Sequence, residues 1–263
     1  MKLKGKIALI TGSAQGMGRA IGIEIAKEGA SVILVDINEE KLRETYEKDI
    51  MSIYKDKTVK GCHYKMDVTD EGQIKETINK IIEKFERIDI LVNNAGVLSS
   101  YPIVELEEKE WDRVIDTNLK GTFLVTKTVL KHMINRRSGR IINIASDSGI
   151  TGKKYLSHYC SSKFGVIGFT QSAAKETGEY NITVNAVCPG PTVTEIYHTK
   201  REMESKIRGI SKEAIINEEN KAFPLGRPAQ PYEIGRLVVF LASDDNTYMT
   251  GEAINISGGL EVH

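Results

Sequence analysis

Residues 7–18, IALITGSAQGMG, join a short apolar run to a glycine-rich turn, and residues 19–29, RAIGIEIAKEG, continue with apolar positions at helical spacing. This order predicts a strand, a tight turn and a helix. Gly12, Gly16 and Gly18 allow the backbone to turn sharply, to approach a pyrophosphate and to pack the helix on a sheet. The helix N-terminus adds unpaired N–H groups and positive potential, which attract phosphate. The stretch therefore predicts the phosphate-binding turn of a dinucleotide site, although a purely structural glycine turn has the same pattern.

A second apolar run, residues 31–35, ends in Asp36, where a carboxylate can accept hydrogen bonds from ribose hydroxyls. The same carboxylate repels a 2′-phosphate. Neither the glycine loop, which contains Gln15, nor the next positions, Ile37 and Asn38, supply the Arg or Lys that would bind such a phosphate. The sequence therefore favours NAD over NADP, and an ordinary strand-end Asp is the alternative.

The rest of the chain alternates between apolar runs and amphipathic stretches. Strands are expected at residues 59–66, 88–92, around Ile141, 182–187 and 252–257, and helices at 39–54, 71–85, 108–133, from Tyr159 onward and 231–243. No internal repeat or linker interrupts the alternation. The pattern predicts one doubly wound α/β domain of Rossmann type over residues 1–263, with a parallel sheet of about seven strands and helices on both faces.

Three groups suited to proton transfer fall within residues 146–163, SDSGITGKKYLSHYCSSK. Tyr159 and Lys163 are four residues apart, so on a helix the phenol and the ammonium share one face. A nearby cation favours tyrosinate and is expected to lower the phenol pKa. Ser146 follows a strand-like run and is expected at the carboxyl edge of the sheet, where open α/β folds place their sites. Without further support, a Tyr and a Lys one turn apart are more often surface residues than catalytic ones.

The composition excludes several classes of protein. Lys and Arg number 36, as do Asp and Glu, so there is no basic excess for a nucleic acid or an anionic membrane. The three cysteines form no CxxC pattern, which indicates neither a disulfide framework nor a metal site and fits a reducing cytoplasm. The apolar run near the N-terminus is too short for a signal peptide or a membrane span.

Taken together, these motifs resemble the short-chain dehydrogenase/reductase family over essentially the whole chain. The shared elements are TGSAQGMG at 11–18, Asp67-Val68, NNAG at 93–96, Asn118, Ser146, YCSSK at 159–163, Pro189-Gly190 and the terminal Gly258-Gly259. Each motif is weak alone, but together they occur in the order and spacing of the family.

The resemblance implies an NAD-dependent oxidoreductase that needs no metal. Tyr159 is the expected general acid/base, Lys163 binds the nicotinamide ribose, Ser146 orients the substrate oxygen, and Asn118 holds a water that relays protons through Lys163. Expected cofactor contacts are Gly12, Gln15, Gly16, Met17, Gly18, Asp36, Ile37, Asp67, Val68, Asn94, Ala95, Gly96, Tyr159, Lys163, Pro189, Gly190, Thr192 and Thr194.

Residues 191–223 are polar and weakly helical, which suits a mobile cover over the substrate. This segment is longer than expected for the family's acyl-carrier-protein reductases, and GISKEAI at 209–215 resembles its polyol and diol dehydrogenases. The expected substrate is therefore a polyol, a sugar alcohol or its phosphate, or a vicinal diol, in a pocket lined by Ser146, Asp147, Ser148, Lys153, Lys154, His158 and Tyr159. A 3-oxoacyl-thioester reductase and a steroid or bile-acid dehydrogenase are the alternatives within the enzyme class.

Two further expectations concern the protein as a whole. An NAD-binding regulator without catalysis is the alternative outside the enzyme class, and the intact set of Asn118, Ser146, Tyr159 and Lys163 argues against it. The resemblance also implies a homotetramer or a dimer, built on the long helices around Asn118 and Tyr159 and on the C-terminal strand.

Overall fold

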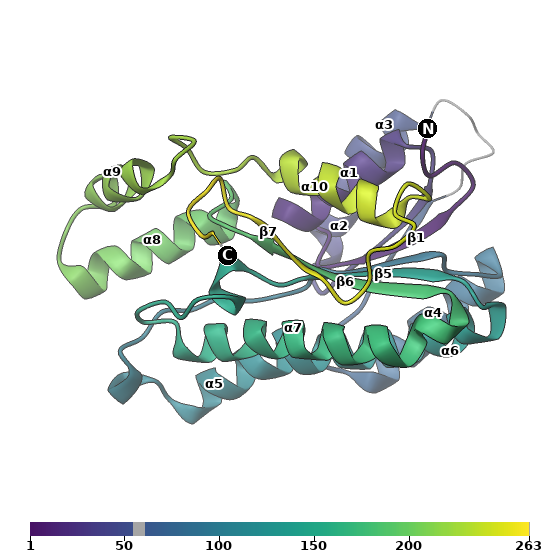
Figure 1. The fold of residues 1–263 in the computed structure, drawn as a ribbon, viewed down its shortest axis with the longest axis horizontal. Helices are drawn as coiled ribbons and strands as arrows, with labels where there is room; N and C mark the ends of the chain where they lie inside the picture. Colours follow the sequence, from purple (N-terminus) through teal and green to yellow (C-terminus); the bar gives the residue numbers. More distant parts are fainter. Residues whose placement is uncertain (55–60, 263) are drawn as a thin grey trace.

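The computed structural model describes residues 1–54 and 61–262, and within them seven parallel strands form one sheet (Figure 1). The strands are β1 (Ile7–Thr11), β2 (Ser31–Asp36), β3 (Cys62–Lys65), β4 (Ile90–Asn93), β5 (Gly139–Ile144), β6 (Ile182–Pro189) and β7 (Ala253–Ile256). Their order in the sheet is β3-β2-β1-β4-β5-β6-β7. The order reverses between β1 and β4, and open α/β sheets bind ligands at such a point, beyond the carboxyl ends of the strands.

The central strands are short apolar runs without polar alternation because both faces of the sheet are covered. Every residue of β1 and β4 is buried, as expected for a parallel sheet between two helical layers. One face is covered by α1 (Gly16–Lys27), α2 (Glu39–Thr45), α3 (Met51–Ile53) and α10 (Pro231–Ala242), and the other by α4 (Glu71–Phe85), α5 (Glu108–Ile115), α6 (Gly121–Arg136) and α7 (Ser157–Thr177) (Figure 1). The predicted single Rossmann-type domain with helices on both faces is confirmed.

The helix expected at 108–133 is divided by one wide turn. The π-helix η3 (Asp116–Lys120) lies between α5 and α6, and Asn118 is inside it. π-turns of this kind are frequent at functional sites. A second π-helix, η1 (Tyr46–Ile50), likewise divides the helix expected at 39–54.

Several strand boundaries also differ from the sequence expectation by one to three residues. The strand expected at 88–92 is observed as Ile90–Asn93, and just before it the Asp89 carboxylate accepts a hydrogen bond from the backbone N–H of Ile7 at 2.8 Å and pairs with Arg136. The start of the strand expected at 59–66 lies outside the described residues, and β3 begins at Cys62.

Residues 191–223 form two helices rather than a weakly helical cover. Helix α8 (Glu195–Arg208) begins with a cap in which the Thr194 hydroxyl accepts from the N–H of Tyr197. Helix α9 (Lys212–Ala222) is capped by Ser211 in the same way. The two helices project beyond the sheet near the chain's C-terminal end (Figure 1). Among the described residues, no helix is both long enough and apolar enough to cross a membrane.

Candidate active site

A cavity of about 650 Å³ lies at the carboxyl ends of the strands. Nearly all of the predicted cofactor residues line it: Gly12, Gln15, Gly16, Met17, Asp36, Ile37, Asp67, Val68, Asn94, Ala95, Gly96, Tyr159, Lys163, Pro189, Gly190, Thr192 and Thr194. Ser146 and Ser148 line it as well. The fold therefore brings the glycine turn and the proton-transfer groups to one hollow, although more than 120 residues separate them in the chain.

The turn after β1 and the segment after β4 are locked together at the point where the strand order reverses. The Thr11 hydroxyl accepts from the N–H groups of Asn94 and Ala95, both at 3.0 Å. The Asn94 side chain donates to the carbonyl of Gly12 at 2.8 Å. Gly12 has φ +61°, and a Cβ there would lie 2.6 Å from Ala95 Cα, so this contact requires glycine.

Gly18 is the predicted cofactor residue of the glycine turn that does not line the cavity. A Cβ on Gly18 would lie 2.2 Å from the carbonyl oxygen of Gly12 and 2.4 Å from Asn94 Nδ2. Its role is to let α1 approach the turn, as expected of the third glycine. The first turn of α1 carries no side-chain cap from Gln15, which leaves its N–H groups available to a phosphate.

Asp36 is held at the end of β2 by two backbone donors. Its Oδ2 accepts from the N–H of Ala14 at 3.0 Å and its Oδ1 from the N–H of Asn38 at 2.9 Å. The sequence reasoning missed Lys41, whose Nζ donates to Gln15 Oε1 at 2.7 Å. The sequence does contain a signal for Lys41: Asn38 is a helix-capping residue, so Lys41 falls in the first turn of α2.

Lys163 and Tyr159 occupy one face of α7, as the spacing predicts. Lys163 Nζ donates to the carbonyl of Ile144 at 2.8 Å and lies 5.7 Å from the centroid of the Tyr159 ring. Burial lowers the pKa of Lys163 to about 8.

Burial also raises the pKa of Tyr159, and a hydrogen bond with Ser146 lowers it in part. The expectation that Lys163 lowers the Tyr159 pKa is not met in this structure, because desolvation of the phenol outweighs the other effects. At neutral pH Tyr159 is therefore a phenol, the form that donates a proton.

Asn118 does not line the cavity but lies directly behind it. Its Oδ1 accepts from the N–H of Val97 at 2.8 Å, and its Nδ2 donates to the Val97 carbonyl and to the Ser162 hydroxyl, both at 3.0 Å. A Cβ on Gly96 would lie 3.2 Å from Asn118 Oδ1 and 3.6 Å from Lys163 Nζ. Asn118 thus ties the segment after β4 to α7 beside Lys163.

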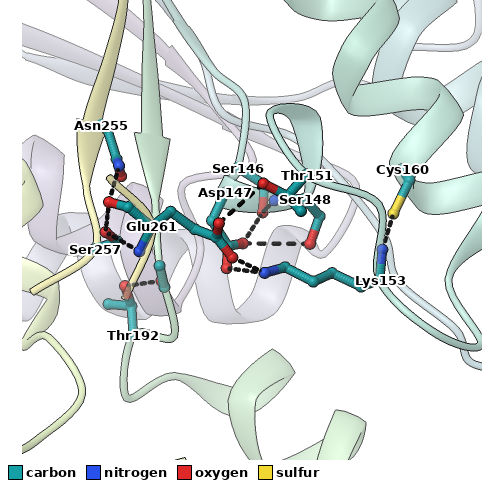
Figure 2. Close-up of polar contacts among 11 residues, drawn as sticks. Ser146, Asp147, Ser148, Thr151, Lys153, Cys160, Thr192, Asn255, Ser257 and Glu261 are labelled. Atoms are coloured by element: carbon teal, nitrogen blue, oxygen red, sulfur yellow. Dashed lines mark hydrogen bonds and ion pairs between the residues drawn. The ribbon is translucent and has the colours of Figure 1, made fainter. Parts of the chain in front are cut away.

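The structure separates the predicted substrate residues into two groups. Ser146, Ser148 and Asp147 line the cavity, whereas Lys153, Lys154 and His158 do not. His158 is fully buried, and its Nε2 lies 2.8 Å from the Ser99 hydroxyl. Lys154 lies over the ring of Tyr155. Lys153 makes an ion pair with Glu261, in the C-terminal tail, and lies 3.7 Å from Asp147 Oδ2 (Figure 2).

The cover contributes side chains that sequence reasoning did not single out. Tyr197, Lys200 and Arg201 line the cavity from α8, and their spacing of three and four residues on a helix was the available signal. Arg201 is 1% exposed, donates to the Tyr197 carbonyl at 2.7 Å and pairs with Glu219 of α9. This ion pair, in which Arg201 is buried and Glu219 is partly exposed, joins α8 to α9.

Comparisons with known proteins agree with this geometry. Residues 6–205 match the model of the family described as short chain dehydrogenase. The chain is 42% identical over 262 residues, and over the full length of both chains, to the 3-oxoacyl-(acyl-carrier-protein) reductase FabG of Thermotoga maritima.

Two solved structures share the fold at recognisable sequence identity. An actinorhodin polyketide ketoreductase variant with NADPH is 36% identical, with a TM-score of 0.92 over 97% of each chain. An NAD⁺-bound xylitol dehydrogenase is 31% identical, with a TM-score of 0.93 over 98% of this chain and 100% of the other. The family match, the identity along the full length and the convergence of Ser146, Tyr159 and Lys163 in one cavity lead to the same conclusion, that the chain belongs to the short chain dehydrogenase family and is an oxidoreductase.

Proposed function

We propose that the protein transfers hydride between NAD(H) and the carbon of a secondary alcohol or ketone, with Tyr159 as the general acid/base. The observation that carries the proposal is that Ser146, Tyr159 and Lys163 line the same cavity as the glycine turn and Asp36. NAD(H) bound along these residues would supply or accept the hydride. The chain's own part is to bind both molecules, to orient them and to move one proton.

The residues present fit a dinucleotide. The uncapped N-terminus of α1 suits the pyrophosphate, and the Asp36 carboxylate, fixed by two backbone donors, suits the ribose hydroxyls. Because that carboxylate would repel a 2′-phosphate, we propose NAD rather than NADP. The opposite argument comes from Lys41, which contacts Gln15, because its ammonium is a nearby cation that would attract the 2′-phosphate of NADP.

In ketone reduction, Tyr159 would act as the proton donor. Burial raises the pKa of Tyr159, which keeps the side chain in the phenol form that carries this proton. Ser146 lines the same cavity as Tyr159 and is placed to contact the substrate oxygen. Holding substrate and cofactor in contact contributes much of the acceleration, about 7–11 kcal/mol for well-oriented groups.

The first candidate substrate is a 3-oxoacyl thioester. This candidate rests on the 42% identity to the Thermotoga maritima reductase and on the similarity to a polyketide ketoreductase. Of the substrates expected from the sequence, it was the alternative, and the relatives favour it over a polyol.

A polyol or diol is the second candidate, and one structural observation favours it. The Asp147 carboxylate lines the cavity beside Ser146, where it can accept a hydrogen bond from a second substrate hydroxyl. The similarity to a xylitol dehydrogenase also supports this candidate.

The two candidates are separated by following absorbance at 340 nm. Acetoacetyl thioesters are offered with NADH or NADPH, and xylitol, sorbitol, sorbitol phosphate and butanediols with NAD⁺ or NADP⁺. Turnover of the thioester alone supports the first candidate, and turnover of a polyol alone supports the second. Turnover that requires the 2′-phosphate would overturn the Asp36 argument.

The Tyr159→Phe variant tests whether the protein is an enzyme at all. Loss of the phenol proton is expected to lower kcat by about 10²- to 10⁴-fold while NADH affinity, measured by fluorescence, is preserved. Unchanged turnover would remove Tyr159 from the mechanism. The absence of turnover in the wild type with all of these substrates, despite NADH binding, would favour the regulator hypothesis.

We also propose a cytoplasmic homotetramer or dimer. All three cysteines are buried and unpaired, which suits a reducing compartment. Aromatic side chains on α6 and α7 are exposed, among them Phe123 at 41% and Phe164 at 46%, and they suit a contact between copies of the chain.

A further inference from the structure

The Ser146 hydroxyl is oriented by its neighbour in the chain. Ser146 Oγ donates to Asp147 Oδ1 at 2.8 Å. The same oxygen accepts from the N–H of Ser148 at 3.1 Å. The Ser148 hydroxyl donates to Asp147 Oδ1 at 3.2 Å. The direction of the Ser146 hydroxyl proton therefore depends on where Asp147 lies.

Asp147 is a buried carboxylate and needs a countercharge. It is 7% exposed, and Lys153 Nζ lies 3.7 Å from its Oδ2. The Lys153 ammonium also pairs with a second carboxylate, because it makes a closer contact with Glu261 Oε1 than with Asp147 (Figure 2). The position of the Lys153 charge is therefore set between two carboxylates.

Glu261 is itself held firmly, although it is close to the end of the chain. Its N–H donates to the Ser257 hydroxyl and its carbonyl accepts from the same hydroxyl, both at 3.1 Å. The Asn255 side chain, on β7, also donates to that carbonyl. From this anchor the Glu261 carboxylate reaches the loop after Ser146, where its Oε2 accepts from the Thr151 hydroxyl at 2.9 Å. Figure 2 shows the tail beside that loop.

We propose that the C-terminal tail is part of the active site: Glu261 positions Lys153, Lys153 positions Asp147, and Asp147, by accepting from the Ser146 hydroxyl, holds Ser146 Oγ in place beside the substrate oxygen. Glu261 and Lys153 are positioning residues, and Asp147 acts in the same way through Ser146, besides any contact that it makes with a polyol hydroxyl. This inference rests on the proposed function, because it requires Ser146 to contact the substrate. It gives a role to Lys153, which the sequence predicts in the substrate pocket and which the structure places outside the cavity lining.

The test measures kcat, substrate KM and NADH affinity in full-length variants, with whichever substrate the panel identifies. Asp147→Asn and Lys153→Met are expected to lower kcat about ten- to hundredfold, because the Ser146 hydroxyl loses its fixed direction. Glu261→Gln is expected to lower kcat about three- to tenfold and to leave NADH affinity within about twofold. Lys153→Arg should restore most of the loss. Glu252→Gln, an exposed glutamate that precedes β7, is the matched control and should leave kcat unchanged.

Coupling between the residues distinguishes positioning from general destabilisation. The double variant Lys153→Met/Glu261→Gln should be no slower than Lys153→Met alone, since both changes break the same chain of contacts. Additive losses, or losses that appear equally in NADH affinity, would overturn the proposal. So would a kcat within about twofold of wild type in both Glu261→Gln and Lys153→Met.

A second measurement does not depend on the substrate. Amide hydrogen exchange over residues 146–151 should be faster in Glu261→Gln than in wild type or Glu252→Gln. Unchanged exchange would show that the tail does not hold this loop. Ser146→Ala distinguishes a failure of the proposed function from a failure of the proposed role of the tail. Wild-type turnover in Ser146→Ala would contradict the proposed function. Loss of turnover in Ser146→Ala together with no effect of Glu261→Gln would contradict only the role of the tail.

Discussion

At the scale of single residues, Lys163 combines deep burial with a charge. Its side chain is 4% exposed, and burial lowers its pKa from 10.5 to about 8. Between these two values the unfolded chain binds more protons than the folded one, so the free energy of unfolding contributed by this group rises with pH. Below about pH 8 both states carry the charge, and the cost of burying it is fully present.

We therefore expect Lys163→Met to be more stable than wild type at pH 7.5, with a difference that narrows by on the order of 2 kcal/mol by pH 9.5. Urea denaturation at a series of pH values measures it. Lys175→Met, on the exposed side of the same helix, is the matched control, because it removes a lysine that is in contact with water. A constant difference for Lys163→Met would contradict the pKa assignment.

Asp36 is the residue from which the choice of cofactor is inferred. Replacing it by Ala removes a charged acceptor for the ribose hydroxyls and the repulsion of a 2′-phosphate. We expect NADH to bind about tenfold more weakly and NADPH to bind relatively better, as measured by fluorescence titration of both. Asp244→Ala, at an exposed surface ion pair, is the control. An unchanged ratio of the two affinities would mean that Asp36 does not select the cofactor.

At the scale of elements, the packing of α1 on the glycine turn decides whether the phosphate site forms. Gly18 has no room for a methyl group, since a Cβ would overlap the Gly12 carbonyl oxygen at 2.2 Å. We expect Gly18→Ala to lower the free energy of unfolding by about 1–3 kcal/mol and to weaken NADH binding. Thermal unfolding and titration measure the two effects.

Gly178→Ala provides the comparison for this change. A Cβ on Gly178 meets nothing within 4 Å, and the backbone there is already helical, so the same substitution should be neutral or slightly stabilising. Equal destabilisation by both substitutions would show that the loss at Gly18 comes from the backbone rather than from the contact with Gly12.

At the scale of the whole molecule, the exposed aromatic side chains of α6 and α7 are the proposed contact between copies of the chain. Phe123 of α6 packs edge-on against Phe169 of α7, so aromatic side chains of the two helices lie together. We expect Phe164→Glu to reduce the assembled mass measured by light scattering, because a charge would be buried at the contact. Met51→Glu, on α3 at the opposite face of the sheet, should leave the mass unchanged. A monomeric wild type at micromolar concentration would contradict the proposed assembly.

The sequence by itself determined the fold class, the order of the elements and most of the cavity lining. Strands and helices follow local periodicity, and a parallel α/β arrangement brings the carboxyl ends of all strands to one edge. The glycine turn, Asp36, Ser146, Tyr159 and Lys163 could therefore be placed at one site without coordinates. Substrate class was less accessible, because it depends on the shape and charge of surfaces that several segments build together.

Only the tertiary structure decided which charges face each other. The spacing of Tyr159 and Lys163 put them on one helix face, but desolvation, which depends on everything packed around them, raised the pKa of the phenol instead of lowering it. The π-turn at Asn118, the Arg201–Glu219 pair of the cover and the contact of Glu261 with Lys153 likewise have no local signal. Lys153 and Glu261 are 108 residues apart, and only the return of the chain along β7 brings them together.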